Sequence, residues 1–314
     1  IIQIPFLYKI DLLVAPKINF KFSGVNKVIK LMLPAILGTA VVQINLLVDS
    51  IVASLLISGS ISWLYYSDRL VELPLGVFGI AIATVILPAL SAKYSKKDIS
   101  SYKSTLKNAL NISVIFSLPA MFGLIVLSSH IIASLFYYGS FTFNDTLMSS
   151  LSLIAYAIGL PAFILMKVLL TAFFSRQDTK TPVRYGVIAV LFNIVMNLFV
   201  LTYYLQSPFD GAHAFLALAT SLSAWLQVIL LYRSLRKSNY IDDNVFFTKT
   251  SYQSLFGCII MVVILSYALV DVSEWAQNVY YIRGILLLMY IMFGAAIYGS
   301  IMYILGYKIK KNYI

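Results

Sequence analysis

Long apolar runs separated by short polar stretches dominate the chain. A membrane helix needs about 20 mostly apolar residues to cross roughly 30 Å of hydrocarbon, and eight runs meet that length. They cover residues 31–57, 73–92, 108–128, 147–174, 183–205, 213–232, 250–270 and 284–307. Only Asp49 breaks the first run and only Lys167 breaks the fourth. The pattern predicts an all-α polytopic membrane protein with eight transmembrane helices in this chain.

Composition supports lipid as the main solvent. Of the 314 residues, 61% are hydrophobic and 11% are charged, whereas soluble domains carry roughly 25% charged residues. A soluble fold with this composition would lack a wettable exterior. The longest polar stretches are short loops, so the sequence predicts no soluble domain.

The net charge is +11, and most of the basic residues lie on one side of the predicted membrane. All but three of the 23 lysines and arginines precede the first run, follow the last run, or lie in every second loop. The exceptions are Arg69, Arg283 and Lys167. By the positive-inside rule the basic side is cytoplasmic, which places both ends of the chain in the cytoplasm, including a tail at 308–314. The charge therefore reports topology and attraction to anionic membrane lipids, and we expect no nucleic-acid partner.

The chain opens on the apolar stretch Ile1 to Leu7, without an initiating Met. It shows neither the charged start nor the cleavage site of a signal peptide. We interpret residues 1–30 as the end of a preceding helix followed by a cytoplasmic linker, and we expect an N-terminal portion before them.

Polar side chains inside three apolar runs are candidates for an ion site, because ionisable groups in a membrane are costly. Asp49 is the clearest. The side chains of Asn193 and Asn197 are four residues apart and share a helix face, and Thr220 lies in the next run. Asp49, Asn197 and Thr220 should lie at matched depth, roughly 12 Å from the outer helix ends. Such oxygens could cage a hard cation such as Na⁺, or could form an interhelical hydrogen-bond cluster.

Two basic residues are candidates for substrate binding. Lys167 lies in the cytoplasmic half of its run, where its amine could snorkel to the interface or line a water-filled cavity. Arg69 lies on the outer side, in a segment whose aromatic residues, Trp63 among them, fit an interfacial belt. It could pair with Glu72 on the helix surface. Unlike most of the basic residues, Arg69 lies on the outer side of the membrane. Its guanidinium suits bidentate binding of a phosphate.

Signals for catalysis are weak. The sequence shows no metal-ligand spacing, nucleophile motif or phosphate-binding Gly-rich loop. A membrane glycosyltransferase would need an acidic set on an outer loop, and Asp210, Asp271 and Glu274 form no recognisable one. We therefore expect a transporter rather than an enzyme, with no cofactor apart from the possible Na⁺ ion.

Several segments resemble the MurJ (MviN) lipid II flippases of the MOP transporter superfamily. The matching segments are long, ordered and correctly spaced. They are Pro34–Gly38 with Gln43–Asn45, Trp63–Val77, Leu87–Ser91, Leu135–Gly139 with Phe141–Thr142, and Ser175–Pro182. The resemblance runs to the end of the chain, although residues 250–270 and 284–307 match only by hydropathy.

The resemblance implies a fourteen-helix, two-lobed transporter of the bacterial inner membrane. This chain would supply helices seven to fourteen, with a six-helix lobe at 31–232 and a two-helix unit at 250–307 that forms a groove for the lipid tail. Its partners would be lipid II, which is linked to undecaprenyl pyrophosphate, and the absent N-terminal lobe. Alternating access would move lipid II outward.

The resemblance also implies that Arg69, with Asp68 and Glu72, lines the central cavity near the pyrophosphate. Another superfamily branch, such as a lipid-linked oligosaccharide flippase or a cation-coupled exporter, is the alternative. The motifs at Trp63–Glu72 and Ser175–Pro182 argue against both.

Overall fold

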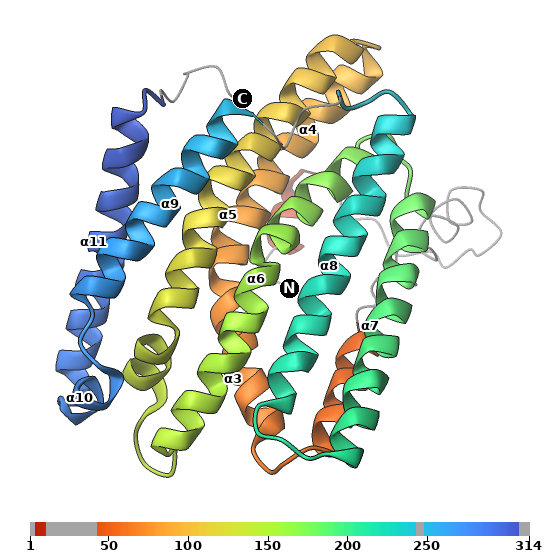
Figure 1. Cartoon of the computed structure of the whole chain (residues 1–314). Coiled ribbons are helices and arrows are strands. Elements are labelled where there is room, and N and C mark those ends of the chain that lie inside the picture. Colours follow the sequence, from red (N-terminus) through yellow and green to blue (C-terminus); the bar gives the residue numbers. More distant parts are fainter. Residues whose placement is uncertain (1–3, 11–42, 243–247, 308–314) are drawn as a thin grey trace.

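The computed structural model describes residues 4–10, 43–242 and 248–307, and every regular element in these ranges is a helix (Figure 1). The elements are α1 (Ile4–Lys9), an unlabelled helix Gln43–Ser54, α3 (Ser60–Pro74), the π-helix η1 (Leu75–Ile80), α4 (Ala81–Ser95), α5 (Ile99–Phe136), α6 (Phe143–Phe174), α7 (Lys180–Gln206), α8 (Ala212–Lys237), α9 (Lys249–Ala268), α10 (Val272–Gln277) and α11 (Tyr280–Ile304). The all-α prediction is confirmed.

Seven helical runs in the described part of the chain are long and apolar enough to cross a membrane. They correspond to seven of the eight predicted spans. The remaining span, 31–57, is described only from residue 43, where the helix Gln43–Ser54 forms its outer part. Its first residues, most of the predicted linker and the predicted tail at 308–314 lie outside the described residues.

The predicted boundaries differ most from the structure in the second and third spans. The second span begins at Ser60 rather than at residue 73, because α3, η1 and α4 form one continuous run to Ser95. Pro74 removes one backbone donor, and the wider π-turn at Leu75–Ile80 follows it without ending the helix. Helix α5 begins at Ile99 rather than at 108, because the Asp98 side chain caps its first turn by accepting a hydrogen bond from the Ser101 amide.

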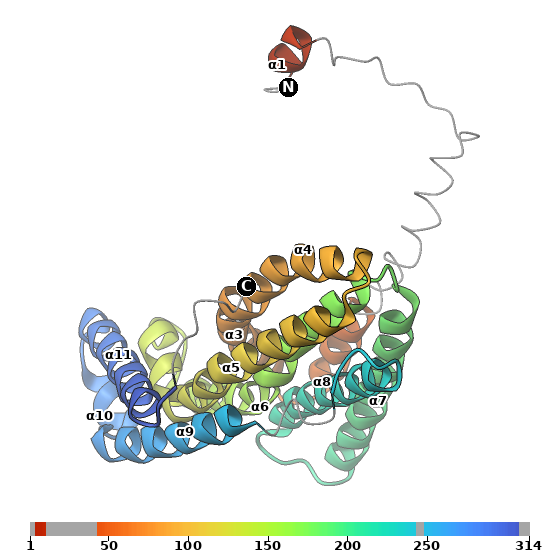
Figure 2. The same ribbon diagram turned by 90° about the horizontal axis from the view of Figure 1, so that it is seen from above.

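Helix α6 lies at the centre of the bundle and contacts α3, η1, α4, α5 and α8 (Figures 1 and 2). Helix α7 packs mainly on α8 at one edge, and α9 and α11 pack on α5 at the other. Gly79 lies against α6, where a Cβ atom would be in van der Waals contact, 3.5 Å from the Cα atom of Ile164. The α3–η1–α4 run thereby packs against the central helix.

The loops gather on two opposite faces of the bundle. On the basic face, the Arg176 guanidinium lies 4.2 Å from the centre of the Tyr240 ring, and Lys103 pairs with Asp242 at 3.1 Å. These contacts join the ends of α6, α5 and α8. The alternation of crossings predicted from the basic residues is therefore confirmed for the described helices.

Arg283, which lies on the face opposite most of the basic residues, has a structural role. It is buried, and its Nη1 and Nη2 atoms donate to the backbone oxygens of Ala133 at 2.9 Å and Tyr137 at 3.0 Å. These carbonyls lie at the C-terminal end of α5, where a helix leaves its last acceptors unpaired. Arg283 thus fastens α11 to α5 on the face opposite the basic loops.

Candidate functional site

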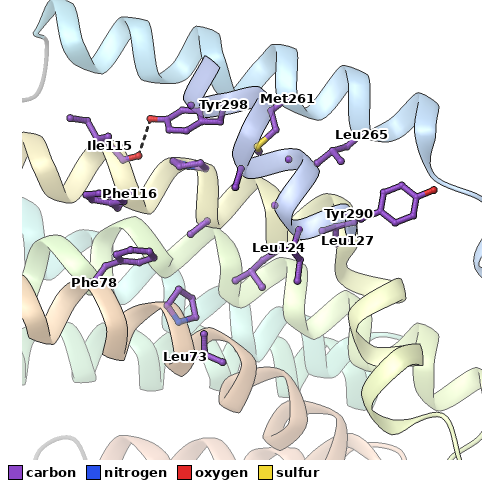
Figure 3. Close-up of a pocket in the computed structure, with 18 of the residues that line it drawn as sticks. Leu73, Phe78, Ile115, Phe116, Leu124, Leu127, Met261, Leu265, Tyr290 and Tyr298 are labelled. Atoms are coloured by element: carbon purple, nitrogen blue, oxygen red, sulfur yellow. Dashed lines mark hydrogen bonds between the residues drawn. The ribbon is translucent and has the colours of Figure 1, made fainter. Parts of the chain in front are cut away.

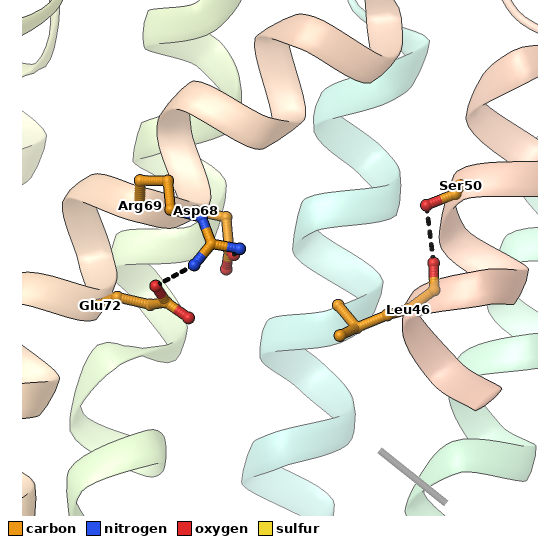
Figure 4. A network of polar contacts seen from close by, with 5 residues as sticks. All are labelled: Leu46, Ser50, Asp68, Arg69 and Glu72. Carbon is orange, nitrogen blue, oxygen red and sulfur yellow. Dashed lines mark hydrogen bonds and ion pairs between the residues drawn. The ribbon is translucent and has the colours of Figure 1, made fainter. Parts of the chain in front are cut away.

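Arg69 stands in the middle of α3 with its guanidinium accessible. Its Nη1 atom donates to Glu72 Oε2 at 2.6 Å, while Asp68 Oδ2 lies 3.9 Å from Nη2 (Figure 4). The Tyr65 ring lies 5.0 Å below the guanidinium carbon. The predicted pairing of Arg69 with Glu72 is confirmed. Because 52% of the Arg69 side chain is exposed, the pair is open to exchange with an external anion.

Trp63 does not belong to an interfacial belt, and that expectation is wrong. Its side chain is buried, its Nε1 atom donates to Asp145 Oδ1 at 2.8 Å, and its ring packs against His213 at 4.8 Å. Asp145 is held in a capping box with Thr142 at the start of α6. Trp63 therefore joins α3 to α6 and α8, which the aromatic composition of the segment does not reveal.

A second hydrogen bond to α6 fixes the rotation of α3 about its own axis. Ser67 is buried, and its hydroxyl donates to the backbone oxygen of Ser149 on α6 at 2.7 Å. Ser67 lies four residues after Trp63 and so shares its face. Arg69 follows two residues later, which rotates it about 200° from Ser67. Anchoring Trp63 and Ser67 in the core therefore directs Arg69 away from it.

The four predicted ion ligands converge. Asp49 accepts hydrogen bonds from Asn197 Nδ2 at 2.5 Å and from Thr220 Oγ1 at 3.3 Å. The Asn193 amide lies 2.9 Å from that of Asn197 and 3.2 Å from Thr220 Oγ1. Asn45, one turn before Asp49, also donates to its carboxylate at 3.2 Å. The matched depth predicted from the sequence is confirmed, across the helix Gln43–Ser54, α7 and α8.

The chemistry of this cluster fits a monovalent cation. Its contacts are those of an interhelical hydrogen-bond cluster, yet Asn197 Oδ1 is buried and has no hydrogen-bond partner. That oxygen has the coordinating capacity that a hard cation uses. The described residues include no group of three or more His, Cys, Asp or Glu suited to a metal. One carboxylate among neutral amide and hydroxyl oxygens suits Na⁺ better than a divalent ion, and Na⁺ binding stays a prediction.

Asp49 of the ion-ligand cluster and Arg69 with its neighbour Asp68 line one cavity of about 240 Å³. Asp49 lines it from the helix Gln43–Ser54, Asp68 and Arg69 line it from α3, and Tyr156 lines it from α6. Leu46 and Ser50 complete the wall formed by the helix Gln43–Ser54, with Leu46 directed toward α3 (Figure 4). The sequence treats the ion site and the arginine as separate features, and the fold brings them together.

Lys167 lies away from this cavity. It is half-buried on α6, about 16 Å further along the helix than Tyr156. Among the described residues no acidic side chain pairs with it. Because α6 ends on the basic face, the Cα–Cβ bond of Lys167 tilts away from that face, which disfavours snorkelling. Its part in substrate binding stays a prediction.

A larger apolar groove lies on the other side of α3. It has a volume of about 1120 Å³ and is lined by α3, η1, α5, α9 and α11 (Figure 3). Phe78 of η1 and Phe116 of α5 stack in its wall at 4.9 Å. The resemblance implies a groove built from the last two helices. The structure adds Leu70 and Leu73 of α3 to its wall, next to Arg69 and Glu72 in the sequence.

Sequence reasoning missed several cavity residues. Leu46 and Ala53 stand three and four residues from Asp49, so helical spacing alone could have placed them on its face. Tyr156 gives no such signal, because an aromatic residue in an apolar run reads as ordinary core. The groove residues are similarly indistinguishable from lipid-facing ones before the helices are assembled.

Solved structures identify the class of fold. An outward-facing multidrug-resistance MATE-family transporter of the MOP superfamily superposes with a TM-score of 0.58, at 14% identity over 88% of this chain and 64% of that one. A structure of the lipid II flippase MurJ in an inward closed conformation superposes with a TM-score of 0.72, at 28% identity over 96% of this chain and 59% of that one. The described helices therefore have the fold of MOP-superfamily transporters.

Sequence comparison narrows the class to one family. The family model "Lipid II flippase MurJ" matches residues 1–291. A probable lipid II flippase MurJ from Vibrio cholerae is 44% identical over 311 residues, which cover 98% of this chain and 57% of the relative. The chain belongs to the MurJ lipid II flippase family and is a multi-pass membrane protein. It spans about 60% of the length of the relatives it matches.

Proposed function

We propose that this chain forms the C-terminal part of a flippase that moves lipid II outward across the bacterial inner membrane by alternating access. One observation carries the proposal. A single helix, α3, presents Arg69 to a polar cavity and Leu70 and Leu73 to a large apolar groove. A ligand with an anionic head and a long apolar tail matches these two adjoining surfaces.

The head group would bind by exchange at Arg69. The guanidinium is held by Glu72 and approached by Asp68, with half of its surface exposed. A pyrophosphate offers two or more oxygens to the planar fork of an arginine. It would therefore replace Glu72 as the guanidinium's partner, and the carboxylate would return to the open cavity.

The tail would lie in the groove. Along α5 its lining runs from Ile112 to Leu135, which is about 35 Å at 1.5 Å per residue. That length matches the thickness of the hydrocarbon core. Apolar contacts along the whole groove would hold a polyprenyl chain while the head group moves.

The basic face would be cytoplasmic, in accord with the positive-inside rule. Arg69 then lies in the outer half of the protein, and Lys167 lies in the inner half. The cavity at Arg69 is one wall of a translocation path, whose other wall would come from the N-terminal lobe. Flipping therefore requires the full-length protein.

Cation coupling is a second candidate activity, favoured by the cluster around Asp49. Its ligands come from three helices and include a buried, unpartnered amide oxygen at Asn197. A Na⁺ ion there would neutralise Asp49, and the Asn197 amide would turn to present its Oδ1 atom in place of the Nδ2 atom that donates to Asp49. Movement of the ion with its gradient would supply energy for transport.

The flippase proposal is tested at Arg69 in the full-length gene. Arg69→Ala and Arg69→Lys are introduced into cells depleted of their own lipid II flippase, and both rescue and lipid II sidedness are measured. We expect Ala to fail at normal protein levels and Lys to rescue partly, because Lys keeps the charge and loses the bidentate fork. Arg184→Ala, on the exposed basic face, is the matched control and should rescue.

Full rescue by Arg69→Ala would show that Arg69 is only an interfacial charge. Failure of the unmutated gene to restore lipid II on the outer leaflet would point to a different lipid-linked substrate.

A further inference from the structure

The guanidinium of Arg69 has two kinds of partner. Glu72 and Asp68 approach its Nη atoms at 2.6 Å and 3.9 Å (Figure 4), whereas the centre of the Tyr65 ring lies 5.0 Å from the guanidinium carbon. A carboxylate occupies the N–H donors that a phosphate needs. An aromatic ring attracts the cation through its π face and brings no competing oxygen to those donors. Tyr65 can therefore stay in place when an anion binds, whereas Glu72 must leave.

Tyr65 is held beside Arg69 by the helix and by a neighbouring ring. It lies four residues before Arg69, shares its helix face and lines the same polar cavity. The next residue, Tyr66, packs against Phe136 at 4.6 Å and Phe141 at 5.5 Å, and its ring meets that of Tyr65 edge to face at 6.1 Å. Both phenylalanines come from matching segments of the sequence that the proposed function does not otherwise use. The outer end of α5 thus supports the aromatic pair beside the guanidinium.

Packing of the bundle does not explain the Tyr65 ring. The residue is 57% exposed, and its hydroxyl makes no hydrogen bond with any described residue. Trp63, two residues earlier, is buried and joins α3 to its neighbours. The contact with the guanidinium is therefore the main interaction that the exposed ring makes toward the cavity.

We propose that Tyr65 is a positioning residue for Arg69 in the binding of the head group. The inference rests on the proposed function and deepens it. When a pyrophosphate displaces Glu72, the long arginine side chain loses its hydrogen-bonded partner. The Tyr65 ring keeps the guanidinium at the cavity with its N–H donors available, so less side-chain freedom is lost when the ligand binds.

Three substitutions isolate the ring. A cation–π contact at an exposed site changes an equilibrium constant by about two- to fivefold, so Tyr65→Leu should weaken lipid II binding by that factor. Tyr65→Phe keeps the π face and should bind lipid II like the unmodified protein. Tyr267→Leu is the matched control, because Tyr267 is an exposed tyrosine of α9 that lines neither the cavity nor the groove.

The experiment measures lipid II binding to the full-length protein in nanodiscs, with thermal unfolding of each variant alongside. Unfolding should be unchanged, because the Tyr65 ring is exposed. A double-mutant cycle separates positioning from direct contact with the ligand. In an Arg69→Gln background, which lacks the guanidinium, Tyr65→Leu should weaken binding by less than about twofold.

Unaltered affinity in Tyr65→Leu, beside weakened binding in Arg69→Gln, would overturn the positioning role and leave the flippase proposal standing. An equal loss with and without the arginine would also overturn it, since the ring would then contact the ligand itself. Weakened binding in Tyr65→Phe would assign the effect to the hydroxyl and contradict the inference. If the unmodified protein bound no lipid II, the proposed function would fail together with the positioning role.

Discussion

The two sides of α3 differ in how they recognise a ligand. The polar cavity is small, about 240 Å³, and depends on a few charged groups whose partners can be named atom by atom. The apolar groove is larger, about 1120 Å³, and depends on many side chains that make no directional contact with a ligand. One side is suited to discriminate a head group, and the other to hold a tail of any similar shape.

This difference predicts how each side responds to change. Removal of a single polar partner leaves another buried or charged group unmatched, so the cavity should be sensitive to individual atoms. The groove should tolerate most apolar exchanges and fail only when its volume is filled, because its contribution scales with contact area. The following substitutions separate these behaviours.

The largest effect is expected on stability at Trp63, which anchors the cavity wall. Trp63→Ala removes a buried ring and its hydrogen bond to Asp145, and should lower the unfolding free energy by about 3–5 kcal/mol. Tyr65→Ala, on the exposed face of the same helix, should change it by about 0.5 kcal/mol or less. Thermal unfolding of the purified full-length protein measures both. Equal losses would mean that Trp63 is not a core residue.

A blocked groove should reduce transport about tenfold without loss of stability. Gly123 lines the groove, and a Cβ atom there meets nothing within 4 Å. Gly123→Trp therefore extends into the space proposed for the tail. A tenfold loss corresponds to about 1.4 kcal/mol of tail contacts. Gly284→Trp is the matched control, because its Cβ also meets nothing within 4 Å and it is not a groove residue. Outer-leaflet lipid II reports both, and equal activity of the two variants would remove the groove from the mechanism.

Loss of one candidate ion ligand should weaken Na⁺ binding about fivefold, equivalent to one hydrogen bond or ligand contact of about 1 kcal/mol. Thr220→Ala removes the hydroxyl that contacts Asp49. Ser223→Ala, on the same helix, removes a hydroxyl bonded only to the helix backbone and should leave binding unchanged. Titration with ²²Na⁺ distinguishes them. An unaltered affinity in Thr220→Ala would identify the cluster as structural.

The smallest effect is expected at Glu72. Glu72→Gln weakens an exposed pair with Arg69 that is worth about 0.2–1 kcal/mol, so lipid II should bind up to about fivefold more tightly. Glu274→Gln, at an exposed position of α10, controls for the loss of one negative charge. Weaker binding in Glu72→Gln would show instead that the carboxylate orients Arg69 for its ligand.

The sequence predicted the polar half of the site better than the apolar half, for a physical reason. A polar residue in an apolar run is rare, so Asp49, Asn197 and Thr220 were identifiable singly, and helical rise placed them at one depth. Their meeting with Arg69 in one cavity depends on how α3 is rotated. That rotation is fixed by Trp63 and Ser67 contacts to α6, which lie 82 residues away in the sequence.

The groove could not be predicted residue by residue. Met261 and Leu265 line it, while Ile259 and Val263 of the same helix are exposed, and nothing in their chemistry separates the two pairs. Element ends were also uncertain. The apolar run that predicted the second span begins at residue 73, after the charged residues Asp68, Arg69 and Glu72, whereas the helix begins at Ser60. Apolarity thus located the predicted span and not the start of the helix.

The π-turn at Leu75–Ile80 changes the directions in which side chains point along the run from Ser60 to Ser95. One π-turn adds one residue to an otherwise regular α-helix, so the residues beyond it lag by about 100° in angular position. The side chains that follow on α4 are thus out of step with the Arg69 face of α3. Deleting one residue of η1 would restore the regular winding and leave α3 and α4 in their present relative orientation. Conversion of the π-turn to an α-turn without a deletion would instead turn α3 by that angle against α4. The head-group side of the helix would then swing toward the tail side, although no ligand-contacting residue had been changed.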